Sequence, residues 1–218
     1  MSDPAEGKTA LLCGTTGLVG SHCLRLLLAD PAYKKVVALT RRPLGAVIAN
    51  PKLDQRIVDF EQLGHFLGGL QVDHVFSALG TTIAKAGSQE QFRRVDFDYP
   101  LAIARAALDA GARHLVLVSS LGADSRGRVF YLKVKGELEE AISGLGYRGL
   151  TYLRPSLLLG ERQEPRLAKQ FYEVLLKAAP KRYRGIEAET VARVMIESAK
   201  AERTGCEILE SPEIAALA

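Results

Sequence analysis

The sequence predicts an α/β fold in which a doubly wound parallel sheet carries helices on both faces. Three observations predict it. Short apolar runs rich in Val, Leu and Ile alternate with longer helical patterns along the chain. The first run leads directly into a turn with three evenly spaced glycines, Gly14, Gly17 and Gly20. The chain has 218 residues, of which 47% are hydrophobic, and this is enough to bury one substantial core.

The expected strands are apolar runs bounded by Gly, Pro or polar residues, as is typical of strands that are buried on both faces. Helical patterns lie between them, and helical crossovers of this length connect parallel strands. The strands cover residues 9–13, 36–40, 56–59, 74–78, 114–119 and 150–153, and the main helices cover residues 18–29, 89–110 and 130–142.

The chain after residue 155 follows a different pattern. A basic segment at 161–184 precedes a helix expected near 187–200, a short strand at 206–209 and a last helical turn. A tail of this size is too small for an independent domain. We therefore expect a single domain over residues 1–218, with residues from about 155 to 218 forming a smaller lobe on the substrate side of the sheet.

Composition and charge exclude several classes of function. The 29 Lys and Arg residues against 25 Asp and Glu give a net charge of +4, which is too small to indicate a nucleic-acid binder. The three cysteines lack disulfide or zinc spacing, and the four histidines lack metal-ligand spacing, so no metal site is expected. A signal peptide and a membrane-spanning apolar stretch are both absent from the sequence, so we expect a cytoplasmic protein.

The glycine turn indicates a dinucleotide site. In a parallel sheet, the pyrophosphate of a dinucleotide lies at the first strand-to-helix turn, on the N-terminus of the helix. Gly14 permits the tight turn, Gly17 lets the backbone approach the phosphates, and Gly20 lets helix and strand pack closely. A purely structural turn is the alternative. The segment expected to contact the cofactor comprises Gly14, Thr16, Gly17, Leu18, Val19 and Gly20.

The end of the second strand favours NADP(H) over NAD(H). An NAD site usually places an acidic residue there, about 20 residues after the glycines, to bind the ribose 2′-hydroxyl. This chain has Arg41 and Arg42 instead. Two guanidinium groups can bind a 2′-phosphate through forked, charge-assisted hydrogen bonds. The alternative is that both are solvated loop arginines.

A Tyr-x-x-x-Lys pair, Tyr131 and Lys135, lies on the helix after the fifth strand, so both side chains project from one helix face. That strand ends in Ser119 and Ser120, at the edge where the nicotinamide is expected. A phenol has an ordinary pKa of ~10 and exchanges protons near neutrality only when a cation stabilises its phenolate. Lys135 can supply that charge, Tyr131 the proton, and a serine hydroxyl the contact to a substrate carbonyl. A surface Tyr–Lys pair beside two loop serines is the alternative.

The combination of these segments resembles the short-chain dehydrogenase/reductase superfamily, in particular its atypical branch and the HIV Tat-interacting oxidoreductase-like family. The segments that carry the resemblance span residues 11 to 162 in order. They are LLCGTTGLVGSHCLRLLL, VVALTRRP, VFSALGTT, VSSLGAD, FYLKVKGELE and YLRPSLLLGER.

The resemblance implies a Rossmann-type fold, NADP(H) binding and a small carbonyl or alcohol substrate. It assigns Ser120, Tyr131 and Lys135 as the catalytic set. It also implies that Asp59 and Phe60 flank the adenine. By the same resemblance, the adenosine ribose lies along Ala78, Leu79, Gly80 and Thr81, and the nicotinamide carboxamide lies beside Pro155, Ser156 and Leu157.

The sequence departs from the best-known branch of the superfamily, which adds a catalytic Asn before the fifth strand. The chain contains a single Asn, Asn50, between the second and third strands, and Asp96 stands on the corresponding helix. Three functions therefore stay open. The chain is an NADPH-dependent reductase, or a regulatory protein in which bound NADPH changes the affinity for a protein partner, or an epimerase or dehydratase that recycles its nucleotide.

The basic segment bears on the substrate of such an enzyme. Residues 161–184 hold seven basic and three acidic side chains. If these groups line a cleft, they would attract an anionic substrate. A solvated basic face explains the same composition.

Overall fold

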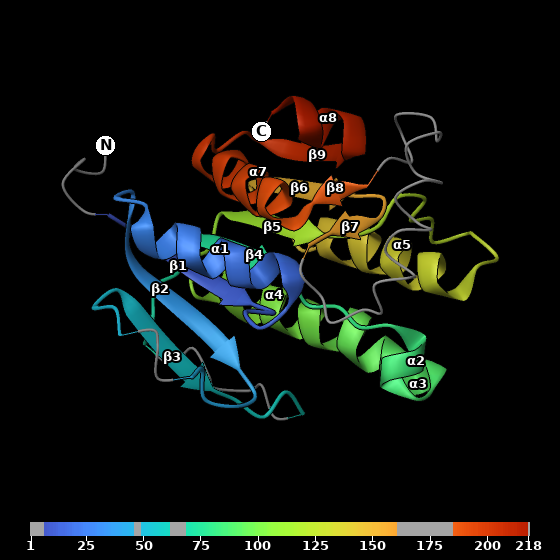
Figure 1. Ribbon diagram of the computed structural model, residues 1–218, viewed down its shortest axis with the longest axis horizontal. Helices are drawn as coiled ribbons and strands as arrows, with labels where there is room; N and C mark the ends of the chain where they lie inside the picture. Colours follow the sequence, from blue (N-terminus) through green and yellow to red (C-terminus); the bar gives the residue numbers. More distant parts are fainter. Residues whose placement is uncertain (1–6, 46–48, 62–68, 161–184, 218) are drawn as a thin grey trace.

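The computed structural model describes residues 7–45, 49–61, 69–160 and 185–217. Its centre is a seven-stranded sheet in the order β3-β2-β1-β4-β5-β6-β9, and every neighbouring pair is parallel (Figure 1). The fold class predicted from the sequence is therefore confirmed. The strands are β1 (Lys8–Cys13), β2 (Tyr33–Thr40), β3 (Leu53–Ile57), β4 (His74–Ser77), β5 (His114–Val118), β6 (Gly149–Arg154) and β9 (Gly205–Glu210).

Helices cover both faces of the sheet, because the central strands are apolar on both sides. On one face α1 (Leu18–Ala29) packs beside α7 (Ala188–Lys200), and both lie in front of the sheet in Figure 1. On the other face lie α4 (Tyr99–Asp109) and α5 (Phe130–Ser143). The remaining short elements are α2 (Ile83–Ala86), α3 (Gln89–Arg93), the π-helical segment η2 (Arg94–Asp98), β7 (Leu158–Leu159), β8 (Ile186–Glu187) and α8 (Ser211–Ala216).

Strand order reverses between β1 and β4, since β2 and β3 lie on one side of β1 and the later strands on the other. A parallel sheet opens a crevice at this point, outside the carboxyl ends of its strands, and ligands bind there in folds of this class. Each predicted site residue follows the carboxyl end of a strand or lies on α5. The topology therefore places them all on the ligand-binding side of the sheet.

Several elements differ from the sequence prediction, and two of the differences bear on the site. The third strand covers Leu53–Ile57 rather than 56–59, so Asp59 lies in the loop after it. This strand lies at one edge of the sheet, and its half-exposed residues include Asp54, Gln55 and Arg56. The continuous apolar run that is typical of fully buried strands is therefore not expected here. The helix expected over 89–110 is also not uniform, because the π-helical η2 separates α3 from α4.

The segment 155–218, expected to form a substrate-side lobe, contributes to the main layers where it is described. Strand β9 pairs with β6, and α7 packs on α1. Residues 161–184 lie outside the described residues, so the lobe and its basic charge stay a prediction. In the described part of the chain, no helix is long and apolar enough to cross a membrane.

Candidate cofactor and catalytic site

The glycine turn after β1 brings three backbone segments so close together that side chains are excluded. Gly14 has a φ of +83°, and a Cβ there would lie 2.4 Å from the carbonyl carbon of Ala78 at the end of β4. A Cβ at Gly20, in the first turn of α1, would lie 2.0 Å from the Gly14 oxygen. Only glycine fits either position. The roles predicted for Gly14 and Gly20 in the tight turn and the close packing agree with this geometry.

The N-terminus of α1 is suited to bind an anion. Its N-cap is Gly17, which offers no side-chain cap, and the first turn carries no acidic residue. The first N–H groups of the helix and the positive end of its dipole are therefore available for a pyrophosphate. Thr16 is exposed beside them, while the Val19 side chain lies in the core, so Val19 offers only its backbone to a ligand. The geometry of the glycine turn and of the N-terminus of α1 therefore fits a dinucleotide.

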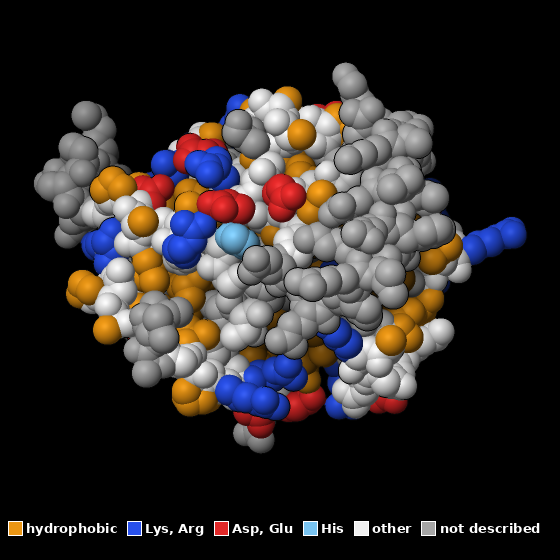
Figure 2. All heavy atoms as spheres, viewed as in Figure 1, with side chains coloured by type: hydrophobic (Ala, Val, Ile, Leu, Met, Phe, Trp, Pro, Cys, Tyr) orange, Lys and Arg blue, Asp and Glu red, His pale blue; other side chains and the backbone are white. Residues whose placement is uncertain are grey.

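The adenine side of the crevice follows β2 and β3. Arg41 and Arg42 are both exposed directly after β2, and Figure 2 shows Lys and Arg side chains gathered near that end of the strand. Gln55 on β3 fixes the start of this loop, since its Nε2 donates to Thr40 Oγ1 at 2.7 Å and to the Arg42 carbonyl at 3.0 Å. Asp59 is exposed, and the Phe60 ring is buried.

The loops after β5 and β6 are tied to each other. Leu121 N–H donates to the Pro155 carbonyl at 3.0 Å, which brings Ser120 and the segment 155–157 to the same edge of the sheet. Ser120 is half-buried, and its hydroxyl donates a long bond of 3.4 Å to the Leu121 carbonyl. The sequence did not predict the contact that holds the Ser156 backbone in place. Its N–H donates to the Ser211 hydroxyl at 2.8 Å, at the start of α8.

Helix α5 carries Tyr131 and Lys135 one turn apart, and the Ser120 loop packs directly on it. Asp124 N–H donates to the Leu132 carbonyl at 3.2 Å. A Cβ at Gly136 would lie 2.3 Å from the Ser125 nitrogen, so the loop touches the helix backbone at this glycine. The structure thus brings the loop of Ser120 against the helix of Tyr131 and Lys135.

Lys135 is almost fully buried and forms an ion pair with Asp96, whose Oδ1 lies 2.7 Å from Nζ. The second oxygen of Asp96 accepts the Thr81 N–H at 2.9 Å. Burial raises the pKa of Asp96 above its ordinary value, and Lys135 and the Thr81 N–H act in the opposite direction. Gly80 lies against the pair, since a Cβ there would be 3.5 Å from Asp96 Oδ1. The Asp96 carboxylate therefore contacts both α5 and the loop that follows β4.

Comparison with known proteins agrees with these features. A family model described as NAD(P)H-binding matches residues 14–202. Protein HTATIP2 of Rattus norvegicus is 35% identical over 216 residues, which cover 96% of this chain and 88% of that protein. The mitochondrial protein fmp52 of Emericella nidulans is 39% identical over 163 residues, or 72% and 70% of the two chains. The chain belongs to the NAD(P)H-binding family of atypical short-chain dehydrogenases/reductases.

Solved structures support the fold of this family member. The Bordetella bronchiseptica enzyme WbmG, solved in complex with NAD, superposes with a TM-score of 0.73 at 15% identity and covers 100% of this chain and 78% of its own. MoeE5 in complex with UDP-glucose and NAD gives 0.69 at 18% identity, covering 96% and 80%. Several relatives are named as mitochondrial proteins, so the expected cytoplasmic location stays a prediction.

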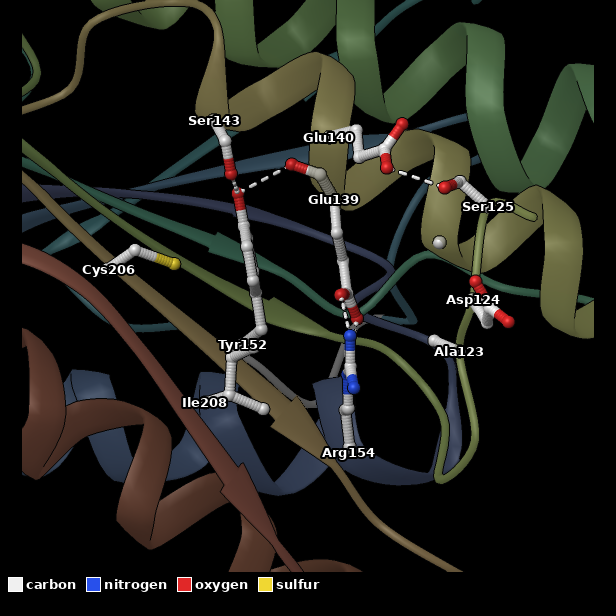
Figure 3. Close-up of a pocket in the computed structure, with 11 residues that line it drawn as sticks. Ala123, Asp124, Ser125, Glu139, Glu140, Ser143, Tyr152, Arg154, Cys206 and Ile208 are labelled. Carbon is white, nitrogen blue, oxygen red and sulfur yellow. Dashed lines mark hydrogen bonds and ion pairs between the residues drawn. The ribbon is translucent and has the colours of Figure 1, made fainter. Parts of the chain in front are cut away.

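A pocket of this chain is lined by none of the predicted site residues. It has a volume of about 380 Å³ and opens between α5, β6 and β9 (Figure 3). An ion pair crosses it, in which Arg154 on β6 donates to both carboxylate oxygens of Glu139 on α5. None of Ser120, Tyr131 and Lys135 lines it. The described residues contain no group of three His, Cys, Asp or Glu side chains that could hold a metal ion, and none was expected.

Proposed function

We propose that this chain is an NADP(H)-dependent reductase of a small carbonyl compound, with Ser120, Tyr131 and Lys135 as its catalytic set. The observation that carries the proposal is the arrangement on α5. Tyr131 is half-buried at the ligand side of the sheet, and a buried lysine with a charged partner follows one helical turn later. A regulatory protein that only binds the cofactor has no need of this set.

The residues divide the chemistry between them. The bound cofactor supplies a hydride to the carbonyl carbon when it is present. The Ser120 hydroxyl orients the carbonyl oxygen, and the Tyr131 hydroxyl donates the proton that this oxygen takes up. The Lys135 ammonium stabilises the phenolate that remains on Tyr131. The product is an alcohol, and Tyr131 regains its proton from solvent before the next turnover.

The phosphate preference is part of the proposal. Arg41 and Arg42 follow β2 directly, and no acidic residue does, at the position where folds of this class bind the adenosine ribose. A carboxylate at this point would repel the phosphate, whereas two guanidinium groups attract it. This supports NADP(H) over NAD(H).

The test is NADPH oxidation by the purified protein against a panel of aldehydes and ketones, half of them carrying a carboxylate. The carboxylated compounds test the anionic substrate predicted from residues 161–184. Tyr131→Phe removes one hydroxyl, so NADPH affinity should be retained while turnover falls by about 10²–10⁴-fold. The matched control is Tyr147→Phe, which removes the hydroxyl that donates to the Ala104 carbonyl at the opposite edge of the sheet. Turnover that is unchanged in Tyr131→Phe would overturn the catalytic assignment and favour the regulatory alternative.

A further inference from the structure

We infer that Asp96 is a positioning residue, whose carboxylate holds Lys135 at the cofactor side of α5 and ties it to the loop after β4. The inference rests on the proposed function for the role of Lys135. It concerns a different element of the chain, because Asp96 lies in η2. Among the contacts of the described residues, Lys135 is the one member of the catalytic set that Asp96 touches.

Each oxygen of the carboxylate contacts a different part of the site. Oδ1 lies 2.7 Å from Lys135 Nζ, and Oδ2 accepts the Thr81 N–H at 2.9 Å. The Asp96 side chain is 0% exposed and that of Lys135 is 5% exposed, so water competes with neither contact. Because Thr81 belongs to the loop predicted to follow the adenosine ribose, one buried group connects that loop to the lysine.

The helical segment that carries Asp96 runs alongside α5 with matching spacing. The Phe92 ring packs on the Tyr131 ring at a centroid distance of 5.4 Å, and four residues later Asp96 meets Lys135. The segment is π-helical from Arg94 to Asp98. A π-helical turn takes in an extra residue and rotates the side chains around it, and such turns are frequent at functional sites. The α3–η2 segment thus contacts both α5 residues of the catalytic set.

The charge of the carboxylate matters as well as its position. A buried ammonium without a partner is costly and favours its neutral form. Among the described residues, Asp96 provides the one carboxylate within 4 Å of Lys135 Nζ, and Tyr131 is the titratable neighbour one turn away on α5. The two arginines of α3 and η2 have other partners, since Arg93 pairs with Glu137 and Arg94 pairs with Glu61 and Glu90. Asp96 therefore places a negative charge beside the Lys135 ammonium that the proposed mechanism uses.

A double-mutant cycle on cofactor binding tests this inference. NADPH dissociation constants are measured by fluorescence near pH 7 and near pH 9 for the wild type, Asp96→Asn, Lys135→Met and the double variant. Asparagine keeps the acceptor for Thr81 N–H but removes the charge. Raising the pH from about 7 to about 9 should weaken NADPH binding about tenfold more in Asp96→Asn than in the wild type. The reason is that the lysine of this variant loses its proton at the higher pH. In the Lys135→Met background, Asp96→Asn should have no further effect at either pH.

Two outcomes overturn the inference. One is a pH dependence of NADPH binding that is the same in Asp96→Asn and in the wild type. The other is an effect of Asp96→Asn on NADPH binding that has the same size with and without Lys135. If Asp96→Asn does not fold, Asp96→Glu is measured in its place. It keeps the charge but moves the carboxylate by one methylene, so it should weaken NADPH binding in the wild-type background and not in Lys135→Met. An equal effect in both backgrounds contradicts the inference. NADPH binding is measured without substrate. A protein that reduced no carbonyl would therefore contradict the proposed function, while the binding experiment would still test the role of Asp96.

Discussion

Two exposed arginines after β2 carry the proposed preference for NADP(H), which differs from NAD(H) by a single phosphate. The guanidinium groups of Arg41 and Arg42 are solvated, so each contact to a phosphate gains less than it would in a buried site. Replacing both with Ala should weaken NADPH binding by about tenfold or more, since a charge-assisted hydrogen bond contributes ~1.5–3 kcal/mol. NADH binding should be unchanged, because that cofactor has no 2′-phosphate.

Affinities of both cofactors for the wild type and the double variant, measured by calorimetry, check this prediction. The matched control is Arg148→Ala, an exposed arginine at the amino end of β6, which should leave both affinities unchanged. NADH binding as tight as NADPH binding in the wild type would contradict the NADP(H) assignment. Low salt enhances the expected difference and high salt reduces it.

Helix α5 depends on one glycine for its contact with the Ser120 loop. In an ordinary exposed helix Gly→Ala gains about 1 kcal/mol, but a Cβ at Gly136 would lie 2.3 Å from the Ser125 nitrogen and 2.5 Å from the Asp124 carbonyl carbon. Both are backbone atoms, so the loop must move. We expect Gly136→Ala to lower the free energy of unfolding by about 1–3 kcal/mol and to reduce turnover, because the displaced loop carries Ser120.

Urea unfolding and NADPH oxidation measure the two effects. Gly144→Ala, at the C-cap of the same helix, is the control, since its Cβ would meet no atom closer than 3.6 Å and its φ is −75°. It should retain stability and turnover. A Gly136→Ala protein as stable and as active as the wild type would show that the loop is not held by this contact.

The elements that the sequence predicted well are those fixed by local pattern. Helix α1 begins and ends at the predicted residues, because the glycine turn and an apolar helix face define it locally. The outer strand β3 was misplaced because half-exposed strands lose the apolar signal. The Asp96–Lys135 pair joins two helices, and Ser211 reaches Ser156 across 55 residues, so neither contact has a local signature. The sequence signals for Asp96 were its place on the helix that corresponds to that of the catalytic Asn, and its position between two apolar residues, Val95 and Phe97.

At the scale of the whole molecule, the sheet has a polar cluster at its amino edge, opposite the predicted catalytic residues. His74 begins β4 and is buried. Its Nδ1 lies 2.8 Å from the Tyr33 hydroxyl, and its Nε2 lies 3.4 Å from a carboxylate oxygen of Glu202, which also pairs with Lys8. These contacts join β1, β2 and β4 to the turn after α7. Burial lowers the pKa of His74 to about 4, with a smaller contribution from Lys8 in the same direction.

This cluster predicts that the fold loses stability in mild acid. The unfolded chain binds a proton at the ordinary histidine pKa of about 6.5, whereas folded His74 stays neutral down to about pH 4. Between these values the unfolded state binds more protons, so the free energy of unfolding falls as the pH falls. From pH 7 to pH 5 the loss from this residue is about 2 kcal/mol. Burial lowers the pKa of His114 too, which adds to the loss in the same direction.

Urea unfolding at several pH values between 7 and 5 measures this dependence. His74→Gln removes the titrating group and should flatten the dependence, although it also lowers stability at pH 7 by removing the Tyr33 contact. His22→Gln, at a half-exposed residue of α1, is the control for the loss of a histidine at the surface. A slope that is the same in His74→Gln and the wild type would assign the acid sensitivity to other groups. Because the cluster is separated from the crevice by the full length of the strands, NADPH affinity near pH 7 should be unaffected by His74→Gln.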